Sequence, residues 1–254
     1  MGATASALAN YQRSVAGRLR YRLAQQNIEQ MHNLNRPLRV LDAAGGNGLN
    51  TEYYLRQGYS VTIFDSDRAM LDQARRRLGA LLERCQILEG TLEQIVDYLP
   101  AEQFDLILCH HALEYLHDGL HVLKALRKLA APAGELSLIT LNPVSEVIRA
   151  VIFRRDAALA SSKLTDFQYD ARWFGQATLY SLEEVTARAK ESGWLLRDFR
   201  AIRIFSDYFP EDEMTKDREH ELLTLEEELT GLEPYRRIGR YAQFCFEKQG
   251  KLFD

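Results

Sequence analysis

A cluster of glycines between two carboxylates is the part of this chain best suited to bind a ligand. Asp42 ends an apolar run and is followed within six residues by three glycines, Gly45, Gly46 and Gly48. Asp65 ends a second apolar run seventeen residues later. Glycines let a ligand lie against the main chain, and an acid at the end of the next strand can bind both ribose hydroxyls. The spacing therefore predicts a site for an adenosine-containing ligand.

The details of the glycine turn argue against a dinucleotide. The dinucleotide-binding fingerprint is Gly-x-Gly-x-x-Gly, or the same pattern with Ala as its last residue. If Gly46 and Gly48 are its first two glycines, the last position is Thr51, so the pattern is absent. From Asp42 the chain instead reads Asp-x-Ala-x-Gly-x-Gly, which resembles motif I of the class I S-adenosylmethionine (SAM) methyltransferases. The resemblance implies that Asp42 lies under the methionine part of SAM. A turn that merely joins a strand to a helix is the alternative, and it leaves the position of Asp65 unexplained.

Further segments narrow the resemblance to one family. They are residues 38–43, 104–115, 202–208, and 233–235 together with 238–241. Over about residues 17 to 248 the chain resembles the tRNA 5-carboxymethoxyuridine methyltransferases. Enzymes of that family methylate the carboxylate of a modified uridine at the tRNA wobble position, giving the methyl ester. The segments after residue 200 lie outside the expected cofactor site and are therefore the more discriminating.

The same resemblance implies a set of SAM contacts. Arg20 would pair with the methionine carboxylate, His110 would lie near the methionine end, and Asp65 would bind the ribose. The other expected contacts line the glycine turn and flank the adenine: Ala44, Gly45, Gly46, Leu92 and Glu93. Structural alternatives remain, since Arg20 with Arg18 and Arg22 could form a solvated helix face and Glu93 could be an exposed helix-start acid.

The implied reaction needs few catalytic groups. A carboxylate acceptor has an ordinary pKa near 4 and is ionised at neutral pH, so it needs no general base. The enzyme must orient and partly desolvate the acceptor, an effect worth about 7–11 kcal/mol when the reactants are aligned. Arginine can grip a carboxylate with two bonds. Arg203 and Arg240 are favoured because they lie in the discriminating segments, with structural ion pairs as the alternative role; the other candidates are Arg149, Arg154 and Arg155.

Metal binding and membrane insertion are not expected. His117 and His121 have a metal-like spacing of four residues but lack a Cys or an acid in ligand register. No run of about 20 apolar residues is present, and residues 1–10 lack the basic and apolar regions of a signal peptide. The odd number of cysteines predicts reduced core thiols in a cytoplasmic protein, at Cys85, Cys109 and Cys245.

Alternating apolar strands and amphipathic helices predict how these residues are positioned. The fold class is α/β: a Rossmann-like, doubly wound, parallel seven-stranded sheet of a class I SAM methyltransferase, with an N-terminal helical lead-in (11–33) and an insertion after the fifth strand. The expected strands are 38–42, 60–64, 85–88, 104–109, 135–141, 195–205 and 241–247, with Pro132 and Gly134 marking the turn into the fifth. The expected helices are 49–57, 68–83, 91–98, 118–130, 181–192 and 212–230.

One methyltransferase domain is expected over residues 1–254. It divides into a helical cap, a SAM-binding core, a substrate lid and the C-terminal part of the sheet, at 1–35, 36–141, 142–180 and 181–254. Apolar and charged contents of 46% and 27% are those of an ordinary globular protein.

The predicted lid is the main candidate for contacts with tRNA. The net charge of −4 offers no global attraction to nucleic acid, so binding would need local stacking and cationic contacts. The lid carries such residues, diluted by Asp156, Asp166 and Asp170; they are Arg149, Arg154, Arg155, Lys163, Tyr169, Arg172, Trp173 and Phe174. Two alternatives stay open: methylation of a small apolar molecule such as a quinone precursor or fatty acid, and SAM binding without catalysis. An electropositive lid would favour tRNA, and a closed apolar pocket would favour the small molecule.

Overall fold

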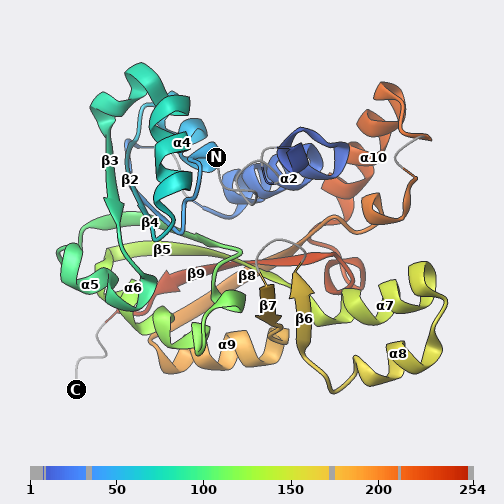
Figure 1. Ribbon diagram of the computed structural model, residues 1–254. Helices are drawn as coiled ribbons and strands as arrows, with labels where there is room; N and C mark the ends of the chain where they lie inside the picture. The colour runs from blue at the N-terminus through green and yellow to red at the C-terminus, as the bar shows by residue number, and fades with distance from the viewer. Residues whose placement is uncertain (1–7, 9, 33–35, 172–174, 211–212, 251–254) are drawn as a thin grey trace.

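A seven-stranded sheet covered by helices on both faces organises the computed structural model, which describes residues 8, 10–32, 36–171, 175–210 and 213–250 (Figure 1). The strand order is β3-β2-β1-β4-β5-β9-β8. All the expected strands are present: β1 (Arg39–Ala43), β2 (Ser60–Asp65), β3 (Cys85–Glu89), β4 (Phe104–His110), β5 (Ala130–Leu141), β8 (Trp194–Ile202) and β9 (Tyr241–Lys248). The order reverses between β1 and β4, and ligands of doubly wound sheets bind at such a switch point.

The direction of β9 departs from the expected all-parallel sheet. Strands β1 to β5 pair in parallel, but β9 is antiparallel to both β5 and β8. The cause is the path of residues 203–240, which leave β8 at the carboxyl edge of the sheet and re-enter β9 at that same edge. Tyr241, the first residue of β9, pairs with the last residue of both neighbours, Leu141 and Ile202.

Seven of the helices pack around this sheet: α2 (Val15–Met31), α3 (Leu49–Arg56), α4 (Arg68–Leu78), α5 (Ile95–Tyr98), α6 (Val122–Leu129), α9 (Leu182–Glu191) and α10 (Lys216–Leu229). Leu23 and Ala24 of α2 pack on Ile202 and Tyr241, on one face of the sheet. Val185 and Ala189 of α9 join Phe199 and Phe244 on the other. Successive side chains along β8 and β9 point to opposite faces of the sheet, so each strand contributes to the core on both faces.

Several element ends differ from the sequence-based expectations. The helix expected over 68–83 stops at Leu78, because Gly79 takes a left-handed φ of 49° and a 3-10 turn follows. The helix expected from 118 begins at Val122 after a 3-10 turn, and α10 begins only after Thr215, whose side chain caps it. The start expected for α10, residue 212, lies outside the described residues.

The strands that flank the last part of the chain also differ in their ends. β8 stops at Ile202 rather than 205, because Arg203 has a φ of +62°. β5 begins at Ala130, and its register with β4 shifts between Phe104 and Leu106, so the turn expected at residues 132–134 is a bulge within the strand.

The insertion after β5 contains α7 (Pro143–Arg154), α8 (Ala157–Ser162) and a small antiparallel pair, β6 (Gln168–Ala171) with β7 (Gly175–Thr178). Helices α7 and α8 lie side by side and extend away from the sheet, next to this pair (Figure 1). Asn142 caps α7, and Pro143 occupies its first turn. Three of the expected RNA contacts, Arg172, Trp173 and Phe174, lie outside the described residues.

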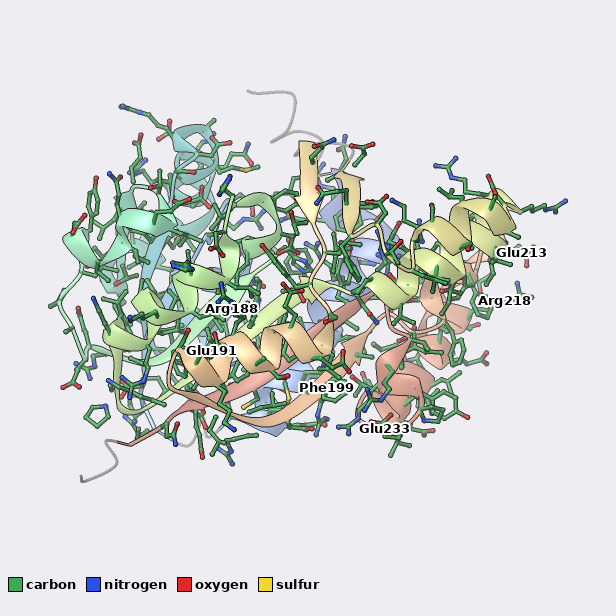
Figure 2. The ribbon with its side chains drawn as sticks, turned by 90° about the horizontal axis from the view of Figure 1, so that it is seen from below. Arg188, Glu191, Phe199, Glu213, Arg218 and Glu233 are labelled. Carbon is green, nitrogen blue, oxygen red and sulfur yellow. The ribbon has the colours of Figure 1, made fainter. Side chains whose placement is uncertain are left out.

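Surface ion pairs add little to the stability of this fold. Arg188 and Glu191 pair on the outer face of α9, and Glu233 pairs with both Arg236 and Arg237 (Figure 2). Exposed pairs of this kind contribute about 0–1 kcal/mol each. The guanidinium of Arg236 also lies 4.2 Å from the ring centroid of Phe199 in β8, which holds the segment before β9 against the sheet.

A buried acid on α10 shapes the turn after β8. Glu226 is 1% exposed, and its carboxylate accepts three backbone N–H bonds, from Ile204 (2.6 Å), Phe205 (2.8 Å) and Ser206 (2.8 Å). This turn carries Arg203, one of the predicted acceptor-binding residues. One helix side chain therefore sets the backbone from which a predicted site residue extends.

We expect Glu226→Ala to lower the free energy of unfolding by about 3 kcal/mol or more, because each buried donor left unsatisfied costs about 1–3 kcal/mol. Urea unfolding would measure the change. Exposed Glu228 on the same helix is the matched control, and Glu228→Ala should change stability by less than about 0.5 kcal/mol. Equal stability of the two variants would contradict this account of the turn.

Candidate active site

A cavity of about 810 Å³ opens at the carboxyl edge of the parallel strands. Its lining comes from α2, from the ends of β1, β2 and β4, from the turn after β3, and from residues 203–241 and the insertion. Its size is within the range of small-molecule sites. The antiparallel entry of β9 brings the last part of the chain to the same edge as the glycine turn.

The glycine turn forms the floor of one end of this cavity. A Cβ on Gly45 would lie 2.8 Å from the Asp42 carboxyl carbon and 2.9 Å from Ile63, so only glycine fits. Ala44 has a φ of +66°, unusual for a residue with a side chain, and its N–H donates to the Phe64 carbonyl at 2.7 Å. Gly45 is therefore required for space, whereas a left-handed angle occurs at Ala44.

Asp42 lies beneath this turn and does not line the cavity. It is 1% exposed, and its Oδ2 accepts a hydrogen bond from Thr51 Oγ1 at 2.7 Å. Burial raises the pKa of Asp42 to about 6, and the nearby charge of Asp65 adds to the rise while Thr51 opposes it. Asp42 could therefore act on a ligand only through the glycine turn, and its expected position under the methionine part of SAM stays a prediction.

Asp65 faces the cavity with its carboxylate fixed by the main chain. Oδ2 accepts the Gly46 N–H and Oδ1 accepts the Asp67 N–H, both at 2.8 Å. Burial raises the pKa of Asp65, and these two bonds oppose the rise. Each oxygen keeps a further acceptor position, which suits the two neighbouring hydroxyls of a ribose. Leu92 and Glu93, in the 3-10 turn after β3, line the cavity nearby.

Arg20 lines the end of the cavity where several aromatic rings gather. Its guanidinium carbon is 4.9 Å from the ring centroid of Tyr11, 4.6 Å from that of Tyr21 and 5.8 Å from that of Tyr241. In the described part of the chain, no carboxylate lies within ion-pair distance of Arg20. Arg18, by contrast, pairs with Glu219 at the surface. Of these two neighbouring arginines, Arg20 is the one placed to bind a carboxylate in the cavity.

Three more arginines line the same end, each already bonded. Arg203 Nη1 donates to Tyr11 Oη at 3.0 Å, and Arg203 and Arg149 both pair with Asp207. Arg240 Nη1 donates to Ser145 Oγ at 3.1 Å and pairs with Glu146. Arg203 and Arg240 are 8% and 6% exposed. The structure thus shows the structural ion pairs, and both residues also face the cavity; their role in holding an acceptor stays a prediction.

Tyr241 lies where these cations converge. Burial alone would raise the pKa of its phenol, but the positive charges of Arg20, Arg203 and Arg240 outweigh burial and lower it. The edge of the His111 ring meets the Tyr241 ring, with centroids 4.6 Å apart. The lowered pKa of Tyr241, the first residue of β9, therefore indicates that arginine charges dominate this end of the cavity.

His110 ends β4 and lines the cavity, as expected. Burial, reinforced by the charge of Arg20, lowers the pKa of His110 to about 3, so the ring is neutral. Its Nε2 lies 3.0 Å from Ser137 Oγ. Ser137 Oγ accepts from Gln243, and Gln243 Oε1 accepts from Asn27 of α2 at 3.1 Å. This buried polar chain fixes α2, and with it Arg20, relative to the end of β4.

The structure therefore gathers most of the predicted residues around one cavity. Those that line it are Arg20, Ala44, Gly45, Gly46, Asp65, Leu92, Glu93, His110, Arg203 and Arg240. Arg149 and Tyr169 of the insertion also line it, whereas Arg154, Arg155 and Lys163 do not. Lining does not test the individual roles, which stay predictions.

Sequence reasoning missed the aromatic cap over the arginines. Tyr11, Tyr21, Tyr115 and Tyr241 all line the cavity. They come from four separate parts of the chain and share no motif, so no local pattern could have grouped them. The one signal in the sequence is that Tyr241 directly follows Arg240, within the 238–241 segment that carries the family resemblance.

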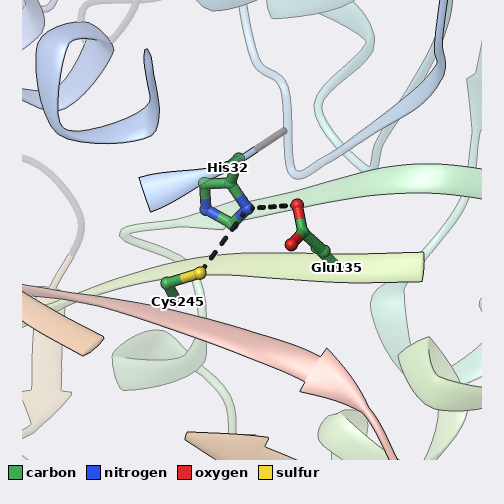
Figure 3. Close-up of side chains that lie close together, drawn as sticks. All are labelled: His32, Glu135 and Cys245. Carbon is green, nitrogen blue, oxygen red and sulfur yellow. Dashed lines mark hydrogen bonds and ion pairs between the residues drawn. The ribbon is translucent and has the colours of Figure 1, made fainter. Parts of the chain in front are cut away.

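A second cluster, none of whose members lines the cavity, lies at the C-terminal end of α2 (Figure 3). His32 Nδ1 is 3.0 Å from Glu135 Oε2 and 3.6 Å from Cys245 Sγ. These side chains are the one group of potential metal ligands found among the described residues, with ligand atoms within 4.8 Å of one another. Glu135 also pairs with Arg197 at 2.8 Å. The cluster joins the end of α2 to β5 and β9.

Two other expectations concern cysteines and membranes. Cys85, Cys109 and Cys245 are free thiols in β3, β4 and β9. No helix in the described ranges is both long and apolar enough to cross a membrane.

Comparison with known proteins identifies the family. A family model described as a methyltransferase domain matches residues 41–138. The tRNA 5-carboxymethoxyuridine methyltransferase of Escherichia coli (strain K12) is 27% identical over 241 residues, 91% of this chain and 89% of its own length. The ubiquinone biosynthesis O-methyltransferase of Histophilus somni (strain 2336) is 30% identical over 165 residues, 61% of this chain and 69% of its own.

Solved structures agree on the fold. A SAM-dependent methyltransferase from Mesorhizobium loti superposes with a TM-score of 0.63 at 17% identity, covering 89% of this chain and 97% of that one. The 1,6-didemethyltoxoflavin-N1-methyltransferase of Burkholderia thailandensis, bound to S-adenosylhomocysteine, gives 0.57 at 16% identity, covering 91% and 78%. The chain belongs to the SAM-dependent methyltransferases. It is an enzyme of the class I fold whose cofactor is SAM.

The residues present fit this cofactor. The missing Cβ at Gly45 leaves the turn closely packed, Asp65 keeps acceptor positions for the ribose, and Arg20 has no carboxylate partner in the described chain. Arg20 would therefore hold the methionine carboxylate, Asp65 the ribose, and Leu92 with Glu93 the adenine.

We expect Arg20→Gln to weaken SAM binding by about 10- to 150-fold, because a hydrogen bond to a charged group contributes about 1.5–3 kcal/mol. Titration calorimetry would measure the dissociation constant. Arg18→Gln is the control, since Arg18 pairs with Glu219 at the surface and should leave SAM binding unchanged. Weaker SAM binding in Arg18→Gln alone would show that the carboxylate had been assigned to the wrong arginine.

Proposed function

We propose that this enzyme methylates the carboxylate of 5-carboxymethoxyuridine at the wobble position of tRNA. The observation that carries the proposal is the charge at the acceptor end of the cavity. Four arginines line that end, namely Arg20, Arg149, Arg203 and Arg240. Two acids pair with them: Asp207 with Arg149 and Arg203, and Glu146 with Arg240. Arg20 would be used by the methionine carboxylate, which leaves a positive surplus for an anionic acceptor.

The chemistry follows from position rather than from acid–base catalysis. SAM supplies a methyl group on a sulfonium, which needs little activation. Arg203 and Arg240 would hold the acceptor carboxylate so that one oxygen is in line with that methyl group. Because the acceptor is already ionised, the neutral His110 has no proton to remove and serves as a wall of the site. Burial of both arginines keeps water from competing for their N–H groups.

The relative that acts on tRNA matches a larger part of this chain than the relative that acts on a small molecule. The likeness to the Escherichia coli tRNA enzyme spans 91% of this chain and 89% of that enzyme. The likeness to the ubiquinone O-methyltransferase of Histophilus somni spans 61%. The insertion contributes Arg149, Tyr169 and Ala171 to the cavity, so its wall includes a cation and an aromatic ring that a tRNA base and its carboxylate could use. An enzyme acting on tRNA would work in the cytoplasm.

The decisive assay is transfer of labelled methyl from SAM to tRNA that carries 5-carboxymethoxyuridine, with the nucleosides resolved by mass spectrometry. We expect one added methyl group at that nucleoside and none in tRNA that lacks the carboxymethoxy group. SAM binding, measured in parallel, is the control for folded enzyme. No transfer by an enzyme that binds SAM would overturn the proposal and favour a small apolar acceptor.

The roles of the two buried arginines can be separated from cofactor binding. We expect Arg203→Lys and Arg240→Lys each to lower kcat/KM for the tRNA by about 10-fold or more, because lysine keeps the charge but cannot form the paired bonds. SAM affinity should be unchanged. Arg200→Lys, a partly buried arginine of β8 that pairs with Asp198, is the matched control. Unaltered kcat/KM in both site variants would leave them as structural ion pairs.

A further inference from the structure

A pair of stacked aromatic rings lies beside two residues that line the cavity, Arg149 and Asp207. Phe153, near the end of α7, is 48% exposed, and its ring lies parallel to that of Tyr208, with centroids 5.7 Å apart and planes 18° from parallel. Val151 and Ile152 are 53% and 49% exposed as well. Consecutive exposed apolar residues on a helix mark an interaction surface rather than a solvated face.

This pair is connected to the cavity by direct contacts. The guanidinium carbon of Arg149 lies 4.9 Å from the ring centroid of Phe153, and Arg149 itself lines the cavity. Tyr208 follows Asp207, which also lines the cavity and pairs with Arg149. A group bound against this pair of rings would therefore lie beside Arg149 and Asp207, and so next to whatever occupies that end of the cavity.

Two exposed positive charges lie beside Phe153. Arg154 and Arg155 follow Phe153 directly, and both are exposed. Neither forms an ion pair with any residue of the described chain, whereas Asp156 uses its carboxylate to cap α8. A surface that joins flat rings to exposed guanidiniums is complementary to stacked bases linked by phosphates.

We propose that Phe153 and Tyr208, with Arg154 and Arg155, form a docking platform for single-stranded RNA, on which a base next to the methylated uridine stacks. The inference rests on the proposed function and adds a surface outside the cavity. The rings would stack the neighbouring base, and the two arginines would contact its phosphates. A small apolar acceptor, enclosed by the cavity, would make no use of rings exposed outside it.

The test measures RNA binding separately from methylation. The probe is a fluorescent anticodon stem-loop RNA without modification, titrated with the full-length enzyme in the presence of S-adenosylhomocysteine. We expect Phe153→Leu to weaken binding by about 5- to 150-fold, the range for removal of one base–aromatic stack. Tyr208→Phe keeps the ring and should bind as the unsubstituted enzyme does. Tyr98→Leu, an exposed aromatic on α5 on the far side of the molecule, is the matched control and should have no effect (Figure 1).

The arginines have their own readout. The double substitution Arg154→Gln with Arg155→Gln should reduce the slope of log K against log salt by about 1.4, because each single-strand phosphate that an arginine neutralises contributes about 0.7 to that slope. Methyl transfer to the free nucleoside 5-carboxymethoxyuridine should be unchanged in this variant and in Phe153→Leu. That result would separate the platform from the catalytic site.

Failure of the platform and failure of the proposed function have different signatures. An enzyme that binds the stem-loop through Phe153 but transfers no methyl group keeps the platform and overturns the proposed acceptor. If the enzyme does not bind the stem-loop, or if Phe153→Leu binds it equally well, the platform is overturned. If Phe153→Leu instead impairs turnover of the free nucleoside to the same degree as of tRNA, the ring belongs to the cavity, and the platform is overturned too.

Discussion

The arginine-lined end of the cavity depends on one constraint, the antiparallel pairing of β9 between β5 and β8. Because β8 ends and β9 begins at the same edge of the sheet, the chain between them must remain where the cofactor binds. Arg203 directly follows β8 and Arg240 directly precedes β9, so strand pairing places both guanidiniums at the cavity. A parallel β9 would begin at the opposite edge and carry Arg240 away from it.

The second requirement is to keep several cations together in a buried place. Arg203 and Arg149 share Asp207, Arg240 pairs with Glu146, and Arg20 lies among the rings of Tyr11, Tyr21 and Tyr241. Such neighbours compensate part of the desolvation cost of a guanidinium. Around Tyr241 the charges of Arg20, Arg203 and Arg240 outweigh burial and Asp207 and lower the pKa of its phenol. An anionic ligand would complete the balance, which links the stability of the site to its specificity.

Sequence reasoning succeeded where function depends on short, contiguous patterns. The turn from Asp42 to Gly48 and the acid at Asp65 predicted the SAM fold, and the apolar periodicity located all seven strands of the large sheet. It was wrong about the direction of β9 and about where α4 ends, because strand direction depends on the path of a long connection and Gly79 interrupts an otherwise helical pattern. It had no means of finding the Glu226 carboxylate beneath the turn at 204–206, since the contact joins residues about twenty positions apart.

The sequence by itself determined the class of this protein, because a glycine turn and a carboxylate on successive strands are local features that bind an adenosine wherever a parallel sheet forms. It also carried the arginines that an anionic acceptor would need. Only the tertiary structure decided which arginines work together: Arg20 rather than Arg18 faces the cavity, Arg149 joins Arg203 through Asp207, and Arg154 and Arg155 remain outside beside Phe153. The physical reason is that these charges come from elements far apart in the sequence: α2, α7 and the two ends of the 203–240 segment. Only the packing of those elements brings the charges together, and the spacing of residues along the chain does not predict that packing.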